Sequence, residues 1–245
     1  MKKFRRTIAF GSAVAALASV SLVGSAASGP VASAEDTWFY DPDRLVFESL
    51  PGTDTETLWG DIDGAAWRFE IPADWNGSLL MWAHGYRGEG LELYVDNPPI
   101  REHLIDQGYA WAASSYERNG YAVRQGVDNT KELADHVIDE LLPAEPDLVL
   151  LSGASMGGHI TGVAIEEHHQ LYDGAMPICG VMGDYELFDY FLDFNVAAQQ
   201  MALGESQFPV DPTTWFSTTV PEIKAELEGV PGGWPFVLSD TGEKF

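Results

Sequence analysis

The chain has 245 residues and a formal net charge of −25, with 38 Asp and Glu against 13 Lys and Arg. A surface this acidic repels nucleic acid and anionic membranes, so we expect neither as a partner. The hydrophobic content of 45% is ample for a buried core, and the single cysteine excludes an internal disulfide.

The amino terminus predicts a secretory signal peptide over residues 1–34. Four of its first six residues are basic, the following stretch is apolar and small, and Ala32-Ser33-Ala34 fits a cleavage site. A retained membrane anchor is the alternative, but the Gly, Ser and Ala content makes a poor span. We therefore expect a secreted, acidic protein without stable membrane insertion after cleavage, with 9 Lys and Arg against 38 Asp and Glu.

Hydrophobic patterns predict alternating strands and helices along the rest of the chain. Strands are expected over 44–48, 66–71, 79–83, 109–114, 148–152 and 175–181, and helices over 97–107, 129–142 and 158–167. Asn129, with Glu132 three residues later, is typical of a helix cap. The alternation predicts an α/β fold with a mostly parallel sheet flanked by helices.

The strand over 148–152 leads into Gly153-Ala-Ser155-Met-Gly157, a G-x-S-x-G pattern followed by a predicted helix. A serine on a sharp strand-to-helix turn needs small neighbours two residues before and after it, and the two glycines supply them. The pattern predicts a nucleophile elbow with Ser155 as nucleophile. An ordinary glycine-rich turn is the alternative.

An earlier buried strand, over 79–83, ends in His84-Gly85-Tyr86. Acyl transfer through a serine builds negative charge on the carbonyl oxygen, which two backbone N–H groups must stabilise. We assign these N–H groups to Met156, directly after the nucleophile, and to Tyr86 on the earlier loop.

Together these motifs, between residues 47 and 182, resemble the α/β-hydrolase superfamily of esterases, lipases and related serine hydrolases. The resemblance implies that the residue after His-Gly, here Tyr86, donates its N–H to the oxyanion hole. It also implies a catalytic acid and then a histidine after the nucleophile, yet no histidine follows His169. The general base is therefore not identifiable. We expect His84 to brace its loop, and His159 to lie one helical turn too deep to reach the Ser155 Oγ.

Asp184 is the candidate acid, because it follows the predicted strand over 175–181 and some members of the superfamily carry their acid there. Its alternative role is the N-cap of the next helix. After residue 182 the alternation stops, and two strand-helix units of about 30 residues each are missing from the usual sheet. The expected organisation is a signal peptide over 1–34, a C-terminally incomplete α/β-hydrolase core over 35–182 and a helical cap over 183–245.

The cap begins with an amphipathic helix over 184–204, whose apolar residues include Phe188 and Phe191. These two residues, with Tyr86 and Tyr116 from the active-edge loops, are candidates for binding substrate. Simple packing onto the core is the alternative for each of them.

We therefore expect a secreted hydrolase that cleaves carboxylic esters, in small molecules or polymers, through an acyl-enzyme on Ser155. A serine peptidase on the same fold is one alternative, and a catalytically inactive or truncated chain is another. No cofactor and no metal is expected, because the Asp-rich turns lack calcium-loop spacing and no Cys/His cluster occurs. The oligomeric state is left open.

Overall fold

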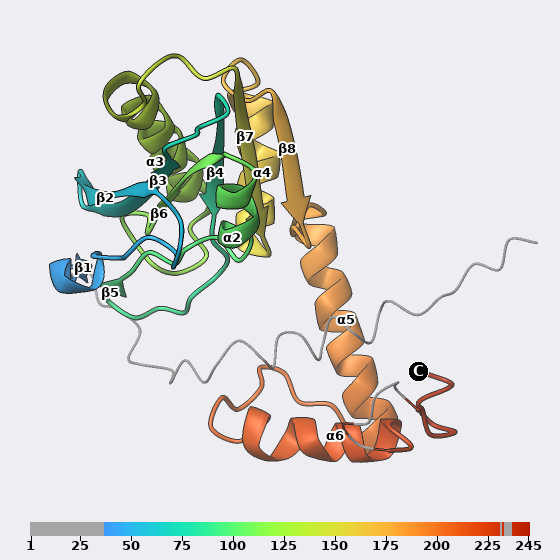
Figure 1. Cartoon of the computed structure of the whole chain (residues 1–245). Coiled ribbons are helices and arrows are strands. Elements are labelled where there is room, and N and C mark those ends of the chain that lie inside the picture. The colour runs from blue at the N-terminus through green and yellow to red at the C-terminus, as the bar shows by residue number, and fades with distance from the viewer. Residues whose placement is uncertain (1–36, 231, 233–236) are drawn as a thin grey trace, which may run out of the picture. The chain divides into compact units, whose positions relative to one another are not determined.

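The computed structural model describes residues 37–230, 232 and 237–245 (Figure 1). The predicted signal peptide over 1–34 lies outside these described residues. Contacts between Cα atoms divide the chain into two compact units, one ending at Gly180 and the other spanning Val181–Phe245. Within the described ranges, no helix combines the length and the apolar character that crossing a bilayer requires.

The first unit is built on a six-stranded sheet with the strand order β2-β3-β6-β4-β7-β8. Strands β6, β4, β7 and β8 run parallel, whereas β3 is antiparallel to both β2 and β6. The strands are β2 (Thr55–Ile62), β3 (Ala65–Pro72), β4 (Ser78–Ala83), β6 (Ala110–Ser114), β7 (Leu148–Ala154) and β8 (Gly174–Ile178). This sheet confirms the predicted α/β architecture. A separate parallel pair joins β1 (Phe39–Tyr40) to β5 (Glu92–Leu93).

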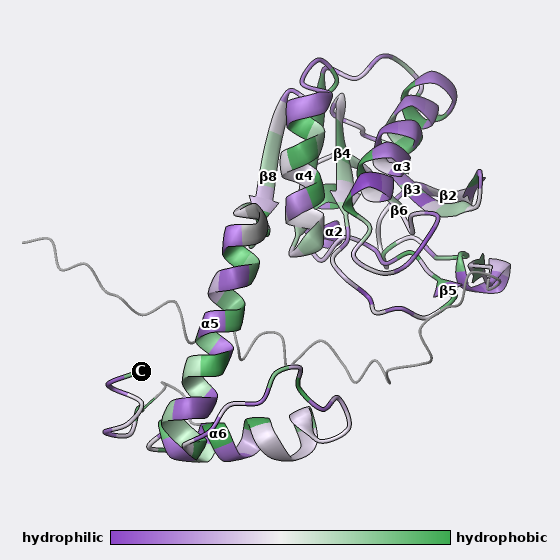
Figure 2. Ribbon diagram, turned by 180° about the vertical axis from the view of Figure 1, so that it is seen from behind, coloured by the Kyte–Doolittle hydropathy of each residue, from purple (hydrophilic) through white to green (hydrophobic). Residues whose placement is uncertain are grey.

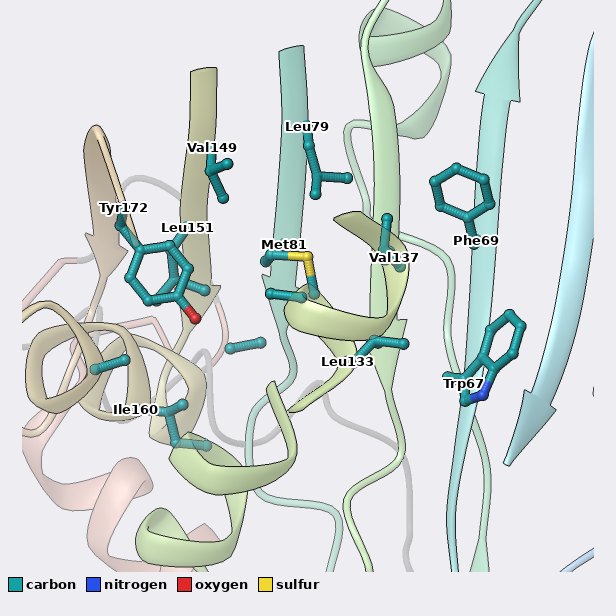
Figure 3. Packing of buried hydrophobic residues seen from close by; sticks show 14 of the residues in the cluster. Trp67, Phe69, Leu79, Met81, Leu133, Val137, Val149, Leu151, Ile160 and Tyr172 are labelled. Atoms are coloured by element: carbon teal, nitrogen blue, oxygen red, sulfur yellow. The ribbon is translucent and has the colours of Figure 1, made fainter. Parts of the chain in front are cut away.

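Helices cover both faces of the sheet because its central strands are apolar on both sides. In β4, Leu79 and Met81 pack with residues of α3 and α4 (Figure 3), whereas Leu80 and Trp82 pack with residues of α2. Strands buried on both faces are typical of parallel sheets. The helical segments are η1 (Pro42–Arg44), α2 (Arg101–Asp106), α3 (Val123–His136), its π-helical continuation η2 (Val137–Leu141) and α4 (Met156–Glu167).

Two of the predicted features, the strand over 44–48 and the helix cap at Asn129, are wrong. Residues 44–48 form no strand; Leu45 and Phe47 are buried against the α2 face of the sheet, but their backbone joins no ladder. Asn129 caps no helix, because α3 begins at Val123. Its side chain instead accepts a hydrogen bond from the Glu117 N–H, which a local capping pattern does not reveal.

The strand predicted over 175–181 is shorter and more exposed than expected. β8 ends at Ile178 and pairs only with β7, so one of its edges meets no other strand among the described residues. Met176 is 52% exposed. Cys179 falls within the predicted range of this strand, but it lies just beyond the end of β8, is exposed and has a positive φ of 51°.

A buried carboxylate ties the amino-terminal strands to α2. Glu70 in β3 is fully buried and accepts hydrogen bonds from the Arg101 guanidinium at 2.6 and 2.9 Å. It also accepts from Trp111 Nε1 at 2.8 Å and from the Thr55 hydroxyl at 2.8 Å. Four donors therefore satisfy this carboxylate without water, as a buried charge requires.

The second unit is helical in its described part. It contains α5 (Asp184–Leu203), the π-helical turn η3 (Trp215–Thr219) and α6 (Val220–Leu227). Figure 2 shows hydrophobic and hydrophilic residues alternating around α5, as the amphipathic pattern predicts. Ala198 of α5 packs with Ile223 and Leu227 of α6 to form a small core of this unit.

We predict that Glu70→Gln lowers the free energy of unfolding by about 3 kcal/mol, because it leaves the largely buried Arg101 guanidinium without its charge partner. Glu92→Gln, which breaks an exposed ion pair with Arg44, is the matched control and should lower it by no more than about 1 kcal/mol. Urea titration monitored by tryptophan fluorescence measures both. Equal effects would show that the buried network does not hold this part of the fold.

Candidate active site

Ser155 occupies a strained turn at the carboxyl end of β7. Its backbone has φ 58° and ψ −122°, and the next residue, Met156, begins α4. A non-glycine residue rarely adopts a positive φ, and such strain persists only where the surrounding structure enforces it. The Ser155 side chain is exposed, so its hydroxyl is open to an incoming molecule.

The strain is enforced by glycines at close backbone contacts. A Cβ atom on Gly153 would lie 2.6 Å from the Ala83 carbonyl oxygen, and one on Gly157 would be nearer still to that oxygen. A Cβ atom on Gly158 would lie 2.7 Å from the Ile178 oxygen. The start of α4 is thus pressed against the ends of β4 and β8, which leaves Ser155 projecting from the sheet edge.

The His84-Gly85-Tyr86 loop lies directly beside Ser155. A Cβ atom on Gly85 would be 3.3 Å from the Ser155 Cβ. Within the described part of the chain, the backbone N–H groups of Tyr86 and Met156 donate to no acceptor. The Met156 N–H also belongs to the first turn of α4, where the helix dipole favours an anion. Two unbonded N–H groups therefore flank the serine, as an oxyanion hole requires.

His84 braces this loop. Its ring is buried, with Nδ1 2.7 Å from the Gly85 oxygen and Nε2 3.0 Å from the Ser115 oxygen. Because a peptide group is planar, fixing the Gly85 oxygen also fixes the direction of the Tyr86 N–H. The His84 imidazole thus fixes the orientation of the Tyr86 N–H, a candidate donor of the oxyanion hole.

The same environment disqualifies His84 as a general base. Burial, followed by the charge of Arg87, lowers its pKa to about 3, against the opposing effect of the two carbonyl oxygens. A neutral imidazole has a single N–H, so only one of the two carbonyl contacts is a hydrogen bond. The shorter contact, to the Gly85 oxygen, favours Nδ1 as the donor.

The remaining histidines have other surroundings. His159, one turn after Ser155, has its Nδ1 3.0 Å from the Tyr121 hydroxyl. The ring of His136 lies against Trp67, with centroids 5.4 Å apart. His103 lies in α2, and His168 and His169 follow α4. No hydrogen bond joins the Ser155 hydroxyl to an imidazole among the described residues.

The four predicted substrate-binding residues differ in exposure and lie in different units of the chain. Tyr86 is 45% exposed, and its hydroxyl donates to Glu89. Tyr116 is fully buried, so the prediction that it lines a cleft is wrong. Phe188 and Phe191 are about half exposed on α5 in the second unit, and their role stays a prediction.

The candidate acid stays untested as well. Asp184 is the first residue of α5, but its side chain lies outside the described residues. The N-cap position of α5 is Gly183, so the alternative role for Asp184 as N-cap is wrong by one residue. Within the described ranges, no group of three or more His, Cys, Asp and Glu is arranged to hold a metal ion.

Sequence reasoning missed Arg87, which stabilises the loop after Tyr86. Its guanidinium is largely buried, donates to the Tyr94 oxygen and to Asp96, and lies 4.4 Å from the Tyr94 ring centroid. An arginine in a polar, glycine-bearing loop gives no local sign that the fold will bury it.

The pKa of His84 predicts a pH dependence of stability. Because its folded pKa of about 3 lies below the ordinary 6.5, the unfolded chain binds more protons between these values, and stability falls as the pH falls from about 6.5. The slope should reach about 1.4 kcal/mol per pH unit. Urea titrations across this range should show the slope in wild type and in the exposed-site control His103→Gln, but not in His84→Gln. An unchanged slope in His84→Gln would contradict the assignment.

The strain at Ser155 predicts that Ser155→Gly stabilises the protein. Relief of a positive φ is worth about 1–3 kcal/mol, and the added freedom of the unfolded glycine offsets part of it. We expect a net gain of about 1 kcal/mol in thermal or urea unfolding. Ser155→Ala, which keeps the strained backbone, should give no such gain. A loss of stability in Ser155→Gly would mean that the turn is not strained.

Comparison with known proteins is consistent with this geometry. The model of the prolyl oligopeptidase family matches residues 105–216, somewhat under half of the chain. No curated protein sequence is significantly similar to the chain.

Solved structures with similar folds include peptidases and esterases. One of a pair of prolyl endopeptidases is 18% identical, with 57% of this chain and 23% of that chain covered and a TM-score of 0.43. The acetyl xylan esterase from Aspergillus awamori is 15% identical, with 51% and 52% covered and a TM-score of 0.40. Brefeldin A esterase, a bacterial homologue of human hormone-sensitive lipase, is 18% identical, with 72% and 59% covered and a TM-score of 0.39.

The chain thus spans less than two thirds of each of these three structures. Its sheet of parallel strands, its strained serine between β7 and α4, and the family match over residues 105–216 agree with one another. The chain thus has a mostly parallel α/β sheet, and its residues 105–216, which include Ser155, are similar to the prolyl oligopeptidase family.

Proposed function

We propose that this protein hydrolyses carboxylic esters through a covalent acyl-enzyme on Ser155. The observation that carries the proposal is the exposed serine on a strained turn, flanked by the unbonded N–H groups of Tyr86 and Met156. The Ser155 Oγ would attack the ester carbonyl carbon, and the two N–H groups would stabilise the oxyanion. The alcohol would depart with the proton that the serine hydroxyl loses and leave an acyl-serine, which water then hydrolyses to the free acid and Ser155.

Two considerations bear on the choice between ester and amide. An amine leaving group must be protonated as it departs, which in serine hydrolases is done by an imidazolium. Among the described residues no imidazole is hydrogen-bonded to Ser155, and an activated ester, whose leaving group departs as a stable anion, makes the smallest demand for one. This favours esters. The match to the prolyl oligopeptidase family favours the alternative, a serine peptidase.

The proposal also includes secretion of the protein and a role for two aromatic residues in binding substrate. A secreted protein is supported by the pattern of residues 1–34 and by the excess of acidic over basic residues. In the second unit, the half-exposed Phe188 and Phe191 of α5 are suited to hold an apolar acyl or aryl group.

A fluorophosphonate probe should label the wild-type protein at Ser155 and should not label Ser155→Ala, because the probe reacts only with an activated serine. Ser206→Ala, at an exposed serine of the second unit, is the control and should label like wild type. Peptide mass spectrometry identifies the modified residue. Turnover of p-nitrophenyl esters and the matching p-nitroanilides then separates esterase from peptidase activity.

Absence of labelling in a folded wild-type sample would contradict the proposal and favour a noncatalytic role for the fold. Faster turnover of the anilides would instead favour the peptidase alternative.

A further inference from the structure

Tyr116 lies at the carboxyl end of β6, next to the loop that carries Tyr86. It is fully buried and has a positive φ of 60°. Two of the strands whose carboxyl ends lie at the site are thus followed by strained non-glycine residues, Tyr116 after β6 and Ser155 after β7. Strain of this kind marks positions that the surrounding structure over-determines.

The Tyr116 side chain makes two contacts with His84. Its hydroxyl donates a hydrogen bond to the His84 carbonyl oxygen at 3.1 Å. Its ring stacks on the His84 imidazole, with centroids 4.0 Å apart and an interplanar angle of 22°. Tyr116 therefore restrains both the backbone and the side chain of the residue that fixes the Gly85 oxygen.

Tyr116 is itself held from several directions. The Ser114 hydroxyl oxygen accepts a hydrogen bond from the Tyr116 backbone N–H at 3.0 Å. The Ser115 hydroxyl donates a hydrogen bond to the Tyr116 backbone carbonyl oxygen at 2.8 Å. On the ring side, a Cβ atom on Gly126 of α3 would lie 3.4 Å from the Tyr116 Cζ, so the helix packs closely against the ring. The phenol is thus a fixed support rather than a mobile side chain.

Packing alone does not account for a tyrosine here, because a phenylalanine would fill the same space without burying a hydroxyl. Tyr172, the other largely buried tyrosine in this unit, shows the contrast: its hydroxyl has no hydrogen-bond partner in the described part of the structure. We propose that Tyr116 is a positioning residue, which acts through His84 to hold the Tyr86 N–H in the direction that the oxyanion needs. This inference rests on the proposed function of Ser155.

The chain offers a matched pair of variants for the test, Tyr116→Phe and Tyr172→Phe, each of which removes one buried hydroxyl. For Tyr116→Phe we expect fluorophosphonate labelling and kcat for a p-nitrophenyl ester to fall roughly three- to tenfold, the factor that one neutral hydrogen bond provides. KM should stay near the wild-type value, because the lost restraint acts on the transition state. Tyr172→Phe should leave both quantities unchanged.

A second readout does not depend on activity. Relaxation-dispersion NMR of the Gly85 and Tyr86 amides should reveal microsecond-to-millisecond exchange in Tyr116→Phe that is absent from wild type and from Tyr172→Phe. If the wild-type protein is not labelled, the proposed function fails, and this measurement alone decides the positioning role.

Wild-type behaviour of Tyr116→Phe in both readouts would overturn the inference, and so would equal losses in the two variants, which would indicate a general packing effect. If Tyr116→Phe does not fold, Ser114→Ala removes only the acceptor of the Tyr116 N–H. This variant should show the same exchange of the Gly85 and Tyr86 amides at smaller amplitude. Absence of that exchange in Ser114→Ala would overturn the inference.

Discussion

The site depends on how closely three backbones approach one another around the Ala83 carbonyl oxygen. That oxygen lies where a side chain on Gly153 or Gly157 would have to be. The end of β4, the end of β7 and the first turn of α4 are therefore in direct backbone contact. This contact forces Ser155 into a positive φ and exposes its hydroxyl. It also places the amino terminus of α4 beside the serine, where partial positive charge stabilises an anion.

Backbone strain in the first unit gathers at one edge of the sheet. Tyr116, Ser155 and Cys179 have positive φ values and follow β6, β7 and β8 directly or within two residues. These three strands run parallel, through β4, so their carboxyl ends meet at the same edge. Open α/β sheets bind their ligands at this edge. The buried Glu70 network, in contrast, joins strands β2, β3 and β6 to α2 and is fully satisfied, as a structural charge should be.

Local patterns correctly predicted those elements in which the spacing of apolar residues along the chain alone reflects which residues are buried. The apolar runs of β4 and β7 identify strands buried on both faces, and the helical spacing after Gly157 identifies α4. Patterns failed where a distant partner decides the outcome. Asn129 resembles a helix cap but accepts from the Glu117 N–H across a loop, and Leu45 and Phe47 alternate like a strand but pack without a ladder. β2 (Thr55–Ile62) was missed because its half-exposed residues carry little apolar signal.

The sequence by itself determined the class of fold and the position of the strained serine turn, because the two glycines of G-x-S-x-G are required wherever a strand turns this sharply into a helix. Only the tertiary structure decided what surrounds that serine. It buried Tyr116, which the sequence suggested for a cleft, and stacked it on His84. It also depressed the pKa of His84 to about 3 through burial and the charge of Arg87. Burial and hydrogen-bond partners depend on segments far apart in the chain, so no local pattern encodes them.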